Sequence, residues 1–242
     1  MTESGLLTVA SYNVWIHAAR NTARQVQLLR RQGVQVAGIQ EVSEGVADPA
    51  VLDGERIWRL SDFQRGDYPH GAFGKAIDVG GGEYGNLVLS DLPLLSVAVV
   101  GLPREKGVED RSILRVEIEV AGQVVSFYTT HLAWDSVELR ARQVEFLKAF
   151  IDEDPNALRV LTGDFNNGSG LAELDLFLDG YRIVNASPGG FRDTFRGPLD
   201  PWTQQRAIDN IIVSSGVEVV DWAVIDSALS DHNPIKATLQ VG

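Results

Sequence analysis

Two short motifs hold residue types suited to hydrolytic chemistry. The sequence Leu-Thr-Gly-Asp-Phe-Asn-Asn fills 161–167 after an apolar run, and Ser-Asp-His-Asn-Pro fills 230–234. Asp164 and Asn166 are two residues apart, so on an extended backbone their side chains point the same way. The adjacent Asp231 and His232 can serve two sides of one site. Such a cluster suits metal-assisted hydrolysis, in which a carboxylate readies a water molecule and an imidazole meets developing negative charge.

Polar side chains also close three other apolar runs. Asn13 ends the first run, Glu41 the second, and His131 follows the run at 124–130. An acid in this position is costly when buried alone, and a hard cation such as Mg²⁺, which prefers oxygen ligands, offsets that cost. Each residue alone also has a plainer interpretation: a solvated strand end for Glu41, a backbone cap for Asn13 and a hydrogen-bonded core histidine for His131.

Asp209 lies within the apolar run Ala-Ile-Asp-Asn-Ile-Ile-Val at 207–213. A buried carboxylate needs a hydrogen-bond partner. A histidine is a natural one, because a carboxylate on one ring nitrogen fixes the tautomer and raises the basicity of the other nitrogen. We therefore expect Asp209 to pair with His232.

The composition excludes several classes of protein. The chain has 242 residues, of which 44% are hydrophobic, and this suffices for a large core. It contains no apolar stretch of membrane-spanning length and no apolar signal core at its start, so we expect a cytoplasmic protein. With no cysteine, disulfides, thiol nucleophiles and cysteine zinc sites are excluded. The net charge of −12 opposes tight binding to long duplex DNA, although it also fits ordinary solubility.

Hydrophobic periodicity predicts many strands and few helices. The expected strands are 6–14, 34–42, 86–90, 94–100, 112–120, 123–130, 158–162, 208–214, 217–225 and 235–241. Helices are expected between Asn21 and Gly33, at 135–152, where Asp135 and Glu138 resemble a capping box, and at 168–178. Long irregular segments are expected at 62–85, 101–111 and 185–206. This pattern fits one domain over 1–242, with two packed sheets covered by helices.

In combination, the motifs resemble the endonuclease/exonuclease/phosphatase superfamily, also known as the deoxyribonuclease-I-like group. The resemblance covers residues 6–241 and rests on Asn13, Glu41, Tyr84-Gly-Asn86, His131, Gly163-Asp164-Phe-Asn166, Ile208-Asp209 and Ser230-Asp231-His232. It implies an α/β (α+β) fold, namely a four-layered α/β/β/α sandwich of two mixed sheets with outer helices. The site would lie at one mouth of the two sheets.

The resemblance implies a metal-dependent phosphoesterase that hydrolyses a phosphodiester or phosphomonoester by in-line attack of an activated water. Glu41 would bind Mg²⁺ or Mn²⁺ with help from Asn13 and Asp231. Asp164 would orient and deprotonate the water, and Asn166 would hold the scissile phosphate.

The resemblance also implies that two histidines contact the phosphate from different sides. His232, paired with Asp209, would meet one phosphate oxygen, and His131 would meet the phosphate from the other side. By analogy with the pancreatic deoxyribonuclease branch, Glu109 would orient His131. The other supporting or substrate-facing positions are Asn86, Tyr84 and Arg111.

The substrate stays open among a nucleic acid, a phospholipid headgroup, an inositol phosphate and a small soluble phosphodiester. Trp15 stands where abasic-site endonucleases often carry an aspartate, which argues against that branch and against a second carboxylate at the metal. The acidic charge argues against duplex DNA but leaves strand ends and single strands open, so an endo- or exonuclease is the alternative function. A noncatalytic phosphate-binding relative is disfavoured, because Asp164, His131 and His232 are all present.

A basic rim around the site would favour nucleic acid, whereas scattered, solvated charges would not. The candidate rim residues are Lys75, Arg104, Lys106, Arg111, Arg192, Arg196 and Arg206. Three aromatic residues in the 185–206 segment, Phe191, Phe195 and Trp202, are placed either to stack on a base or sugar or to pin the segment to the core.

Overall fold

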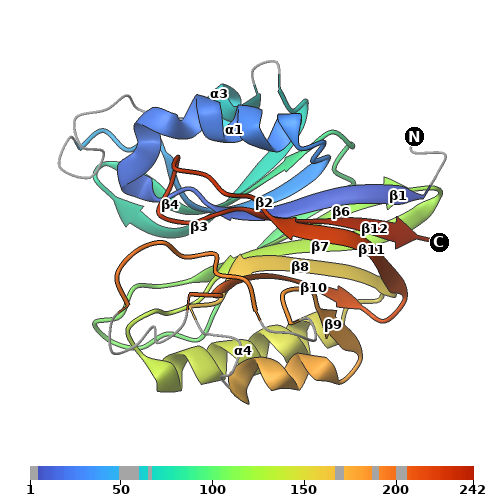
Figure 1. Cartoon of the computed structure of the whole chain (residues 1–242). Coiled ribbons are helices and arrows are strands. Elements are labelled where there is room, and N and C mark those ends of the chain that lie inside the picture. Colours follow the sequence, from blue (N-terminus) through green and yellow to red (C-terminus); the bar gives the residue numbers. More distant parts are fainter. Residues whose placement is uncertain (1–4, 49–59, 65–66, 167–171, 187–190, 200–205) are drawn as a thin grey trace.

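Two six-stranded sheets pack face to face in the computed structural model, and helices cover the outer face of each sheet (Figure 1). The structure describes residues 5–48, 60–64, 67–166, 172–186, 191–199 and 206–242. The four layers confirm the α/β/β/α sandwich predicted from the sequence. No helix in the described ranges is long and apolar enough to cross a membrane.

The first sheet has the strand order β11-β12-β1-β2-β4-β3. Strands β1 and β2 run parallel, and the other neighbours in this sheet are antiparallel. The strand bounds are Leu6–Asn13 for β1, Val36–Glu44 for β2, His70–Val79 for β3, Gly82–Ser90 for β4, Val217–Val224 for β11 and Ile235–Val241 for β12.

The second sheet has the order β5-β6-β7-β8-β10-β9, and β7 and β8 are its parallel pair. The strand bounds are Ser96–Gly101 for β5, Ser112–Val120 for β6, Gln123–His131 for β7, Leu158–Asp164 for β8, Tyr181–Ile183 for β9 and Asp209–Ser214 for β10. The helical elements are η1 (Ile16–Asn21), α1 (Thr22–Arg31), α3 (Leu60–Gln64), α4 (Val137–Asp152) and η2 (Ala172–Leu178).

Apolar side chains fill the space between the sheets and beneath the helices on both outer faces. Val9 of the first sheet and Phe127 of the second belong to the core cluster between the sheets. Leu29 of α1 belongs to the cluster on the outer face of the first sheet, and Leu147 of α4 to the cluster on the second. Burying a side chain of this size contributes roughly 1.5–3 kcal/mol. Apolar residues that alternate along the strands therefore stabilise the packing on both faces of each sheet.

The expectation that 62–85 is irregular was wrong, because this segment holds part of the short helix α3, all of β3 and the start of β4. The segment is rich in glycine, a residue type that is typical of turns and loops. In the structure Gly74 and Gly85 lie inside the paired strands, where a side chain on Gly74 would collide with Leu114 of the facing sheet and one on Gly85 would collide with the Gly74 backbone. The glycines therefore permit close packing within the sheets.

Two smaller expectations at helix ends also need correction. Helix α4 begins at Val137, two residues later than predicted, and its cap is Ser136, whose Oγ accepts a hydrogen bond from the Leu139 N–H at 3.2 Å. Asp135 and Glu138 therefore do not form the predicted capping box. The expected helix at 168–178 is a 3₁₀ helix from Ala172, and its first residues lie outside the described ranges.

Gly38 on β2 offers a test of how closely the two sheets approach. A Cβ placed there would overlap the hydroxyls of Thr129 and Thr162 on the facing sheet. We expect Gly38→Ala to lower the free energy of unfolding by about 1–3 kcal/mol through overpacking, measured by urea denaturation. Gly101→Ala is the matched control, because no atom lies within 4 Å of its Cβ position. Equal stabilities for the two variants would contradict the packing argument.

Candidate active site

Strand ends from both sheets meet at one mouth of the sandwich. In the second sheet, the register places His131 of β7 beside Asp164 of β8, and Asp164 beside Asp209 of β10. In the first sheet, β1 ends at Asn13 next to the part of β2 that carries Glu41. Paired strands thus hold His131, Asp164 and Asp209, whereas Asn166, Asp231 and His232 lie in connecting segments beside them.

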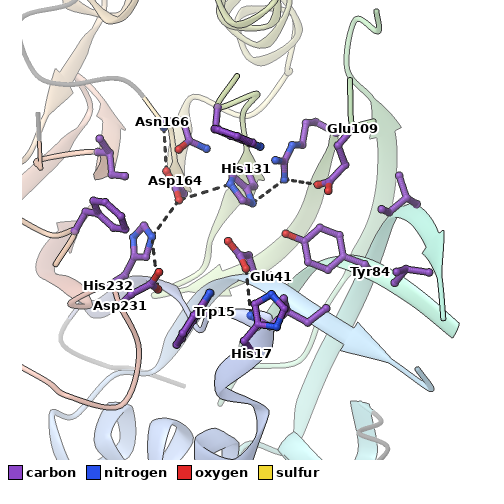
Figure 2. Close-up of a pocket in the computed structure, with 17 residues that line it drawn as sticks. Trp15, His17, Glu41, Tyr84, Glu109, His131, Asp164, Asn166, Asp231 and His232 are labelled. Atoms are coloured by element: carbon purple, nitrogen blue, oxygen red, sulfur yellow. Dashed lines mark hydrogen bonds and ion pairs between the residues drawn. The ribbon is translucent and has the colours of Figure 1, made fainter. Parts of the chain in front are cut away.

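A cavity of about 620 Å³ opens at this mouth (Figure 2). Three residues predicted from the sequence are buried behind the cavity wall. Asn13 and Asp209 bind the lining residues Asp164 and His232, and Asn86 binds the start of β6. The other nine predicted residues line the cavity: Glu41, Tyr84, Glu109, Arg111, His131, Asp164, Asn166, Asp231 and His232.

Asp164 is the buried centre of the site. Its Oδ2 accepts a hydrogen bond from Asn13 Nδ2 at 2.9 Å, and its Oδ1 accepts one from the backbone N–H of Asn166 at 2.9 Å. The Nε2 atoms of His131 and His232 lie 3.6 Å and 3.7 Å from the same Oδ2. Burial and the nearby Asp209 carboxylate raise the pKa of Asp164 to about 7 against the opposing effects of His232 and Asn13, which suits a group that takes a proton near neutral pH.

His232 forms the predicted pair with Asp209, and their Nδ1 and Oδ2 atoms are 2.8 Å apart. The Phe195 ring packs against the imidazole with centroids 5.0 Å apart. Burial alone would lower the pKa of His232, but Asp209 and Asp164 outweigh it and raise the pKa to about 10. This environment favours the imidazolium form of His232, whose Nε2 lies 3.7 Å from Asp164 Oδ2.

His131 has the opposite electrostatic environment. Arg111 Nη1 lies 2.9 Å from His131 Nδ1, and Arg111 also pairs with Glu109 at 2.8 Å. A guanidinium offers only donors, so Nδ1 must accept and the imidazole proton must be on Nε2. Burial, Arg111 and His232 all hold the pKa of His131 well below its usual range. The structure thus places Arg111, rather than the predicted Glu109, against His131.

Residues behind Arg111 fix its position. Asn86 Nδ2 donates to the backbone carbonyl of Ser112 at 3.0 Å, which anchors the start of β6 next to Arg111. The buried Tyr84 also interacts with Arg111, and burial together with the Glu41 charge raises the Tyr84 pKa. Asn86 and Tyr84 therefore support the guanidinium.

Glu41 and Asp231 are the open carboxylates of the site. Glu41 has a positive φ of 61°, and its carboxylate accepts hydrogen bonds from Asn13 Nδ2 at 3.0 Å and from the backbone N–H of Ile16 at 3.1 Å. Burial raises the pKa of Asp231, and the nearby Glu41 charge adds to this effect. Asn13 Oδ1 accepts the Trp15 N–H, so Asn13 mainly positions its neighbours.

The donor set fits a hard divalent cation. Four carboxylates line the cavity, those of Glu41, Glu109, Asp164 and Asp231, against one lining guanidinium. Oxygen-rich ligation of this kind is what Mg²⁺ and Mn²⁺ prefer. Asp164, Asp209 and His232 form a second, buried group whose ligating atoms lie within 4.8 Å of one another, but Asp209 and His232 already bond each other.

The described residues do not support the hypothesis of a basic rim. Of the seven candidate rim residues, Arg111 alone is among the described residues that line the cavity. Lys75 pairs with Asp78 and Glu83, whereas Arg192 stacks on Trp222. Arg104 and Arg196 pair with Asp110 and Asp226, and Arg206 donates to the Gly197 carbonyl. Lys106 lies in an exposed turn.

Of the three aromatic candidates, Phe195 packs on His232, Phe191 is partly exposed and Trp202 lies outside the described residues. Sequence reasoning did not assign the apolar walls of the cavity, which include Trp15, Ile16, Ile77, Val79 and Trp134. The one available signal was Trp15, noted as an unusual residue two positions after Asn13.

Comparisons with known proteins agree on one family. A model described as the Endonuclease/Exonuclease/phosphatase family matches residues 10–232. No protein in the curated set matches the sequence. Among solved structures, an endonuclease/exonuclease/phosphatase from Beutenbergia cavernae has a TM-score of 0.77 at 22% identity, covering 98% of this chain and 72% of its own.

Two further structures carry more specific descriptions. A mannosyl-6-phosphatase from Bacteroides thetaiotaomicron has a TM-score of 0.72 at 21% identity, covering 96% of this chain and 99% of its own. D. rerio TDP2, solved with a single-strand DNA product, has a TM-score of 0.73 at 19% identity, covering 97% and 98%. At these identities the likeness concerns the fold.

The contact between Arg111 and His131 predicts the tautomer of this histidine. We expect ¹⁵N NMR of the ring nitrogens to show His131 neutral at neutral pH, with its proton on Nε2. Arg111→Gln removes a repulsive charge and should raise the pKa of His131 toward its ordinary range, although burial still opposes this. Arg104→Gln, an exposed arginine substitution, should leave the His131 signals unchanged. A proton found on Nδ1 in the unsubstituted protein would refute the assignment.

Proposed function

The chain belongs to the endonuclease/exonuclease/phosphatase family, and we propose that it is a metal-dependent phosphoesterase that hydrolyses small phosphate esters by direct attack of water. The observation that carries this proposal is the convergence of two histidine Nε2 atoms, 3.6 Å and 3.7 Å away, on one Asp164 oxygen. A phosphate placed there would meet a base and two N–H donors at once. Phosphoryl transfer needs this positioning and charge neutralisation more than covalent chemistry.

Each residue has a distinct part in the proposed mechanism. Asp164 takes the proton of the attacking water as the new phosphorus–oxygen bond forms and the bond from phosphorus to the ester oxygen breaks, and the departing alkoxide takes a proton from solvent water. His232, held by Asp209, is the permanent positive charge beside the phosphate oxygens. His131, held neutral by Arg111, donates a hydrogen bond through Nε2–H.

Glu41 and Asp231 would hold the divalent cation, with Asn13 orienting Glu41. When bound, Mg²⁺ or Mn²⁺ would polarise the phosphoryl group and offset its negative charge. The side-chain amide of Asn166 donates one N–H to the Leu132 carbonyl at 2.9 Å. Its second N–H has no acceptor among the described residues and would bind the substrate.

A small ester is favoured over internal positions of duplex DNA. Duplex binding draws its free energy from many phosphate contacts by basic residues. Here Arg111 lines the cavity, and most of the other candidate basic residues have partners elsewhere in the described structure. The family includes a mannosyl-6-phosphatase and a protein solved with a single-strand DNA product, so strand ends remain the alternative substrate.

Chelation tests the proposed cation requirement. A chelator should abolish hydrolysis, and Mg²⁺ or Mn²⁺ should restore it. Glu41→Gln should raise the cation concentration needed for half-maximal activity by about tenfold or more, because it removes one charged oxygen ligand. Glu119→Gln is the control, since Glu119 is exposed on β6. Undiminished turnover in chelator would contradict the requirement.

Asp164→Asn tests the proposed base, using a panel of sugar phosphates, alkyl phosphodiesters, short oligonucleotides and supercoiled plasmid. The substitution keeps size but removes the proton acceptor, so kcat should fall by about 10²- to 10⁴-fold with little change in KM. Asp221→Asn, on the exposed edge of β11, should retain full activity. Near-normal turnover by Asp164→Asn would assign the base elsewhere, and plasmid nicking above every small ester would overturn the proposed substrate class.

A further inference from the structure

Strained backbone is concentrated at the cavity. Four residues other than glycine have positive φ in the described structure: Trp15, Glu41, Ala121 and Asn166, with φ of 56°, 61°, 51° and 50°. Ala121 lies in the tight turn between β6 and β7, where positive φ is common. The other three line the cavity. Conformations of this kind are costly and persist where the surrounding contacts determine them, which makes them markers of functional positions.

Trp15 is held in its conformation by the site itself. Its φ of 56° and ψ of 109° suit glycine rather than a bulky residue. Its N–H donates to Asn13 Oδ1 at 2.9 Å, and the next N–H, that of Ile16, donates to Glu41 at 3.1 Å. The same contacts that position Glu41 therefore force the tryptophan backbone into this region.

The indole is only partly buried despite this strain. Trp15 remains 39% exposed and makes an edge contact with the His17 ring, with centroids 5.6 Å apart. In Figure 2 it lies beside Asp231 and His17, across the cavity from Asn166. A large apolar side chain that is strained, exposed and directed at a cavity is poorly explained by core packing.

Other parts of the cavity wall are also apolar. Ile16, Ile77 and Val79 line the same cavity, as does Trp134, which is 45% exposed. The polar groups gather around Asp164 and the two histidines. A cavity of about 620 Å³ holds far more than a phosphate, so the remaining space faces the alcohol part of an ester.

We propose that Trp15 is a specificity-determining residue whose indole packs against a flat, apolar ring carried next to the phosphate by the alcohol part of the substrate. The proposal rests on the proposed phosphoesterase function. The ring belongs either to an aromatic alcohol or to a nucleobase, because both present a π-face to an indole.

The test compares ring and non-ring esters of similar leaving-group reactivity. Benzyl, cyclohexylmethyl and glycerol phosphates are supplied as monoesters and as methyl diesters, with thymidine 5′-(methyl phosphate) in parallel. The unsubstituted protein should have its highest kcat/KM on the benzyl or the thymidine ester, and this choice identifies the source of the ring. Equal efficiency on the benzyl, cyclohexylmethyl and thymidine esters would overturn the proposal.

Trp15→Gly separates a substrate contact from a structural role. Glycine relieves the positive φ, which raises Tm, whereas loss of the partly buried indole lowers it, so Tm should change little. Losing the stacking surface should lower kcat/KM on the preferred ring ester by about 5- to 100-fold, mainly through KM, with little change on glycerol phosphate. Trp15→Phe should recover most of the loss. A marked fall in Tm with equal losses on all esters would show a structural role and refute the proposal.

Two controls complete the design. Ala121→Gly relieves a positive φ outside the cavity, so it should raise Tm while leaving every kinetic constant unchanged. Calorimetric titration with benzylphosphonate and methylphosphonate needs no turnover. We expect benzylphosphonate to bind more tightly than methylphosphonate, and Trp15→Gly to abolish this difference. That result would support the inference even if no ester were hydrolysed, so a failure of the proposed function is distinguished from a failure of the inference.

Discussion

A buried carboxylate at the end of β8 is the constraint on which the rest of the site depends. Asp164 is almost fully removed from water, and an isolated charge there would be expensive. Asn13 from the other sheet, the Asn166 N–H and two imidazoles surround it. Because these groups come from both sheets, the packing of the sandwich and the ionisation of Asp164 cannot be separated.

The imidazoles of His131 and His232 differ in charge preference because different groups contact their Nδ1 atoms. A carboxylate on Nδ1 makes His232 a cation, whereas a guanidinium on Nδ1 makes His131 a neutral donor. Both rings still direct Nε2 at the same Asp164 oxygen. The site therefore directs two imidazoles of different charge preference at one carboxylate oxygen.

The sequence predicted the layered fold and the pairing of His232 with Asp209, because alternation and a lone acid in an apolar strand are local signals. It misled at 62–85, where glycines that permit close sheet packing look like loop glycines. The sequence also suggested Glu109 as the residue that orients His131, whereas Arg111 lies between the two in the structure, and the path of the segment before β6 decides which side chain reaches the imidazole. The strain at Trp15 lies in its backbone dihedral angles, which the residue type does not predict.

Placing the reactive groups on paired strand ends has a consequence for how such a protein changes over evolutionary time. His131, Asp164 and Asp209 are locked in register by ladder hydrogen bonds, while the cavity walls come largely from the connecting segments. Insertions and substitutions in those segments leave the ladder intact. Chains that share about a fifth of their residues can thus keep one fold, while the segments that form the walls of the cavity are free to differ.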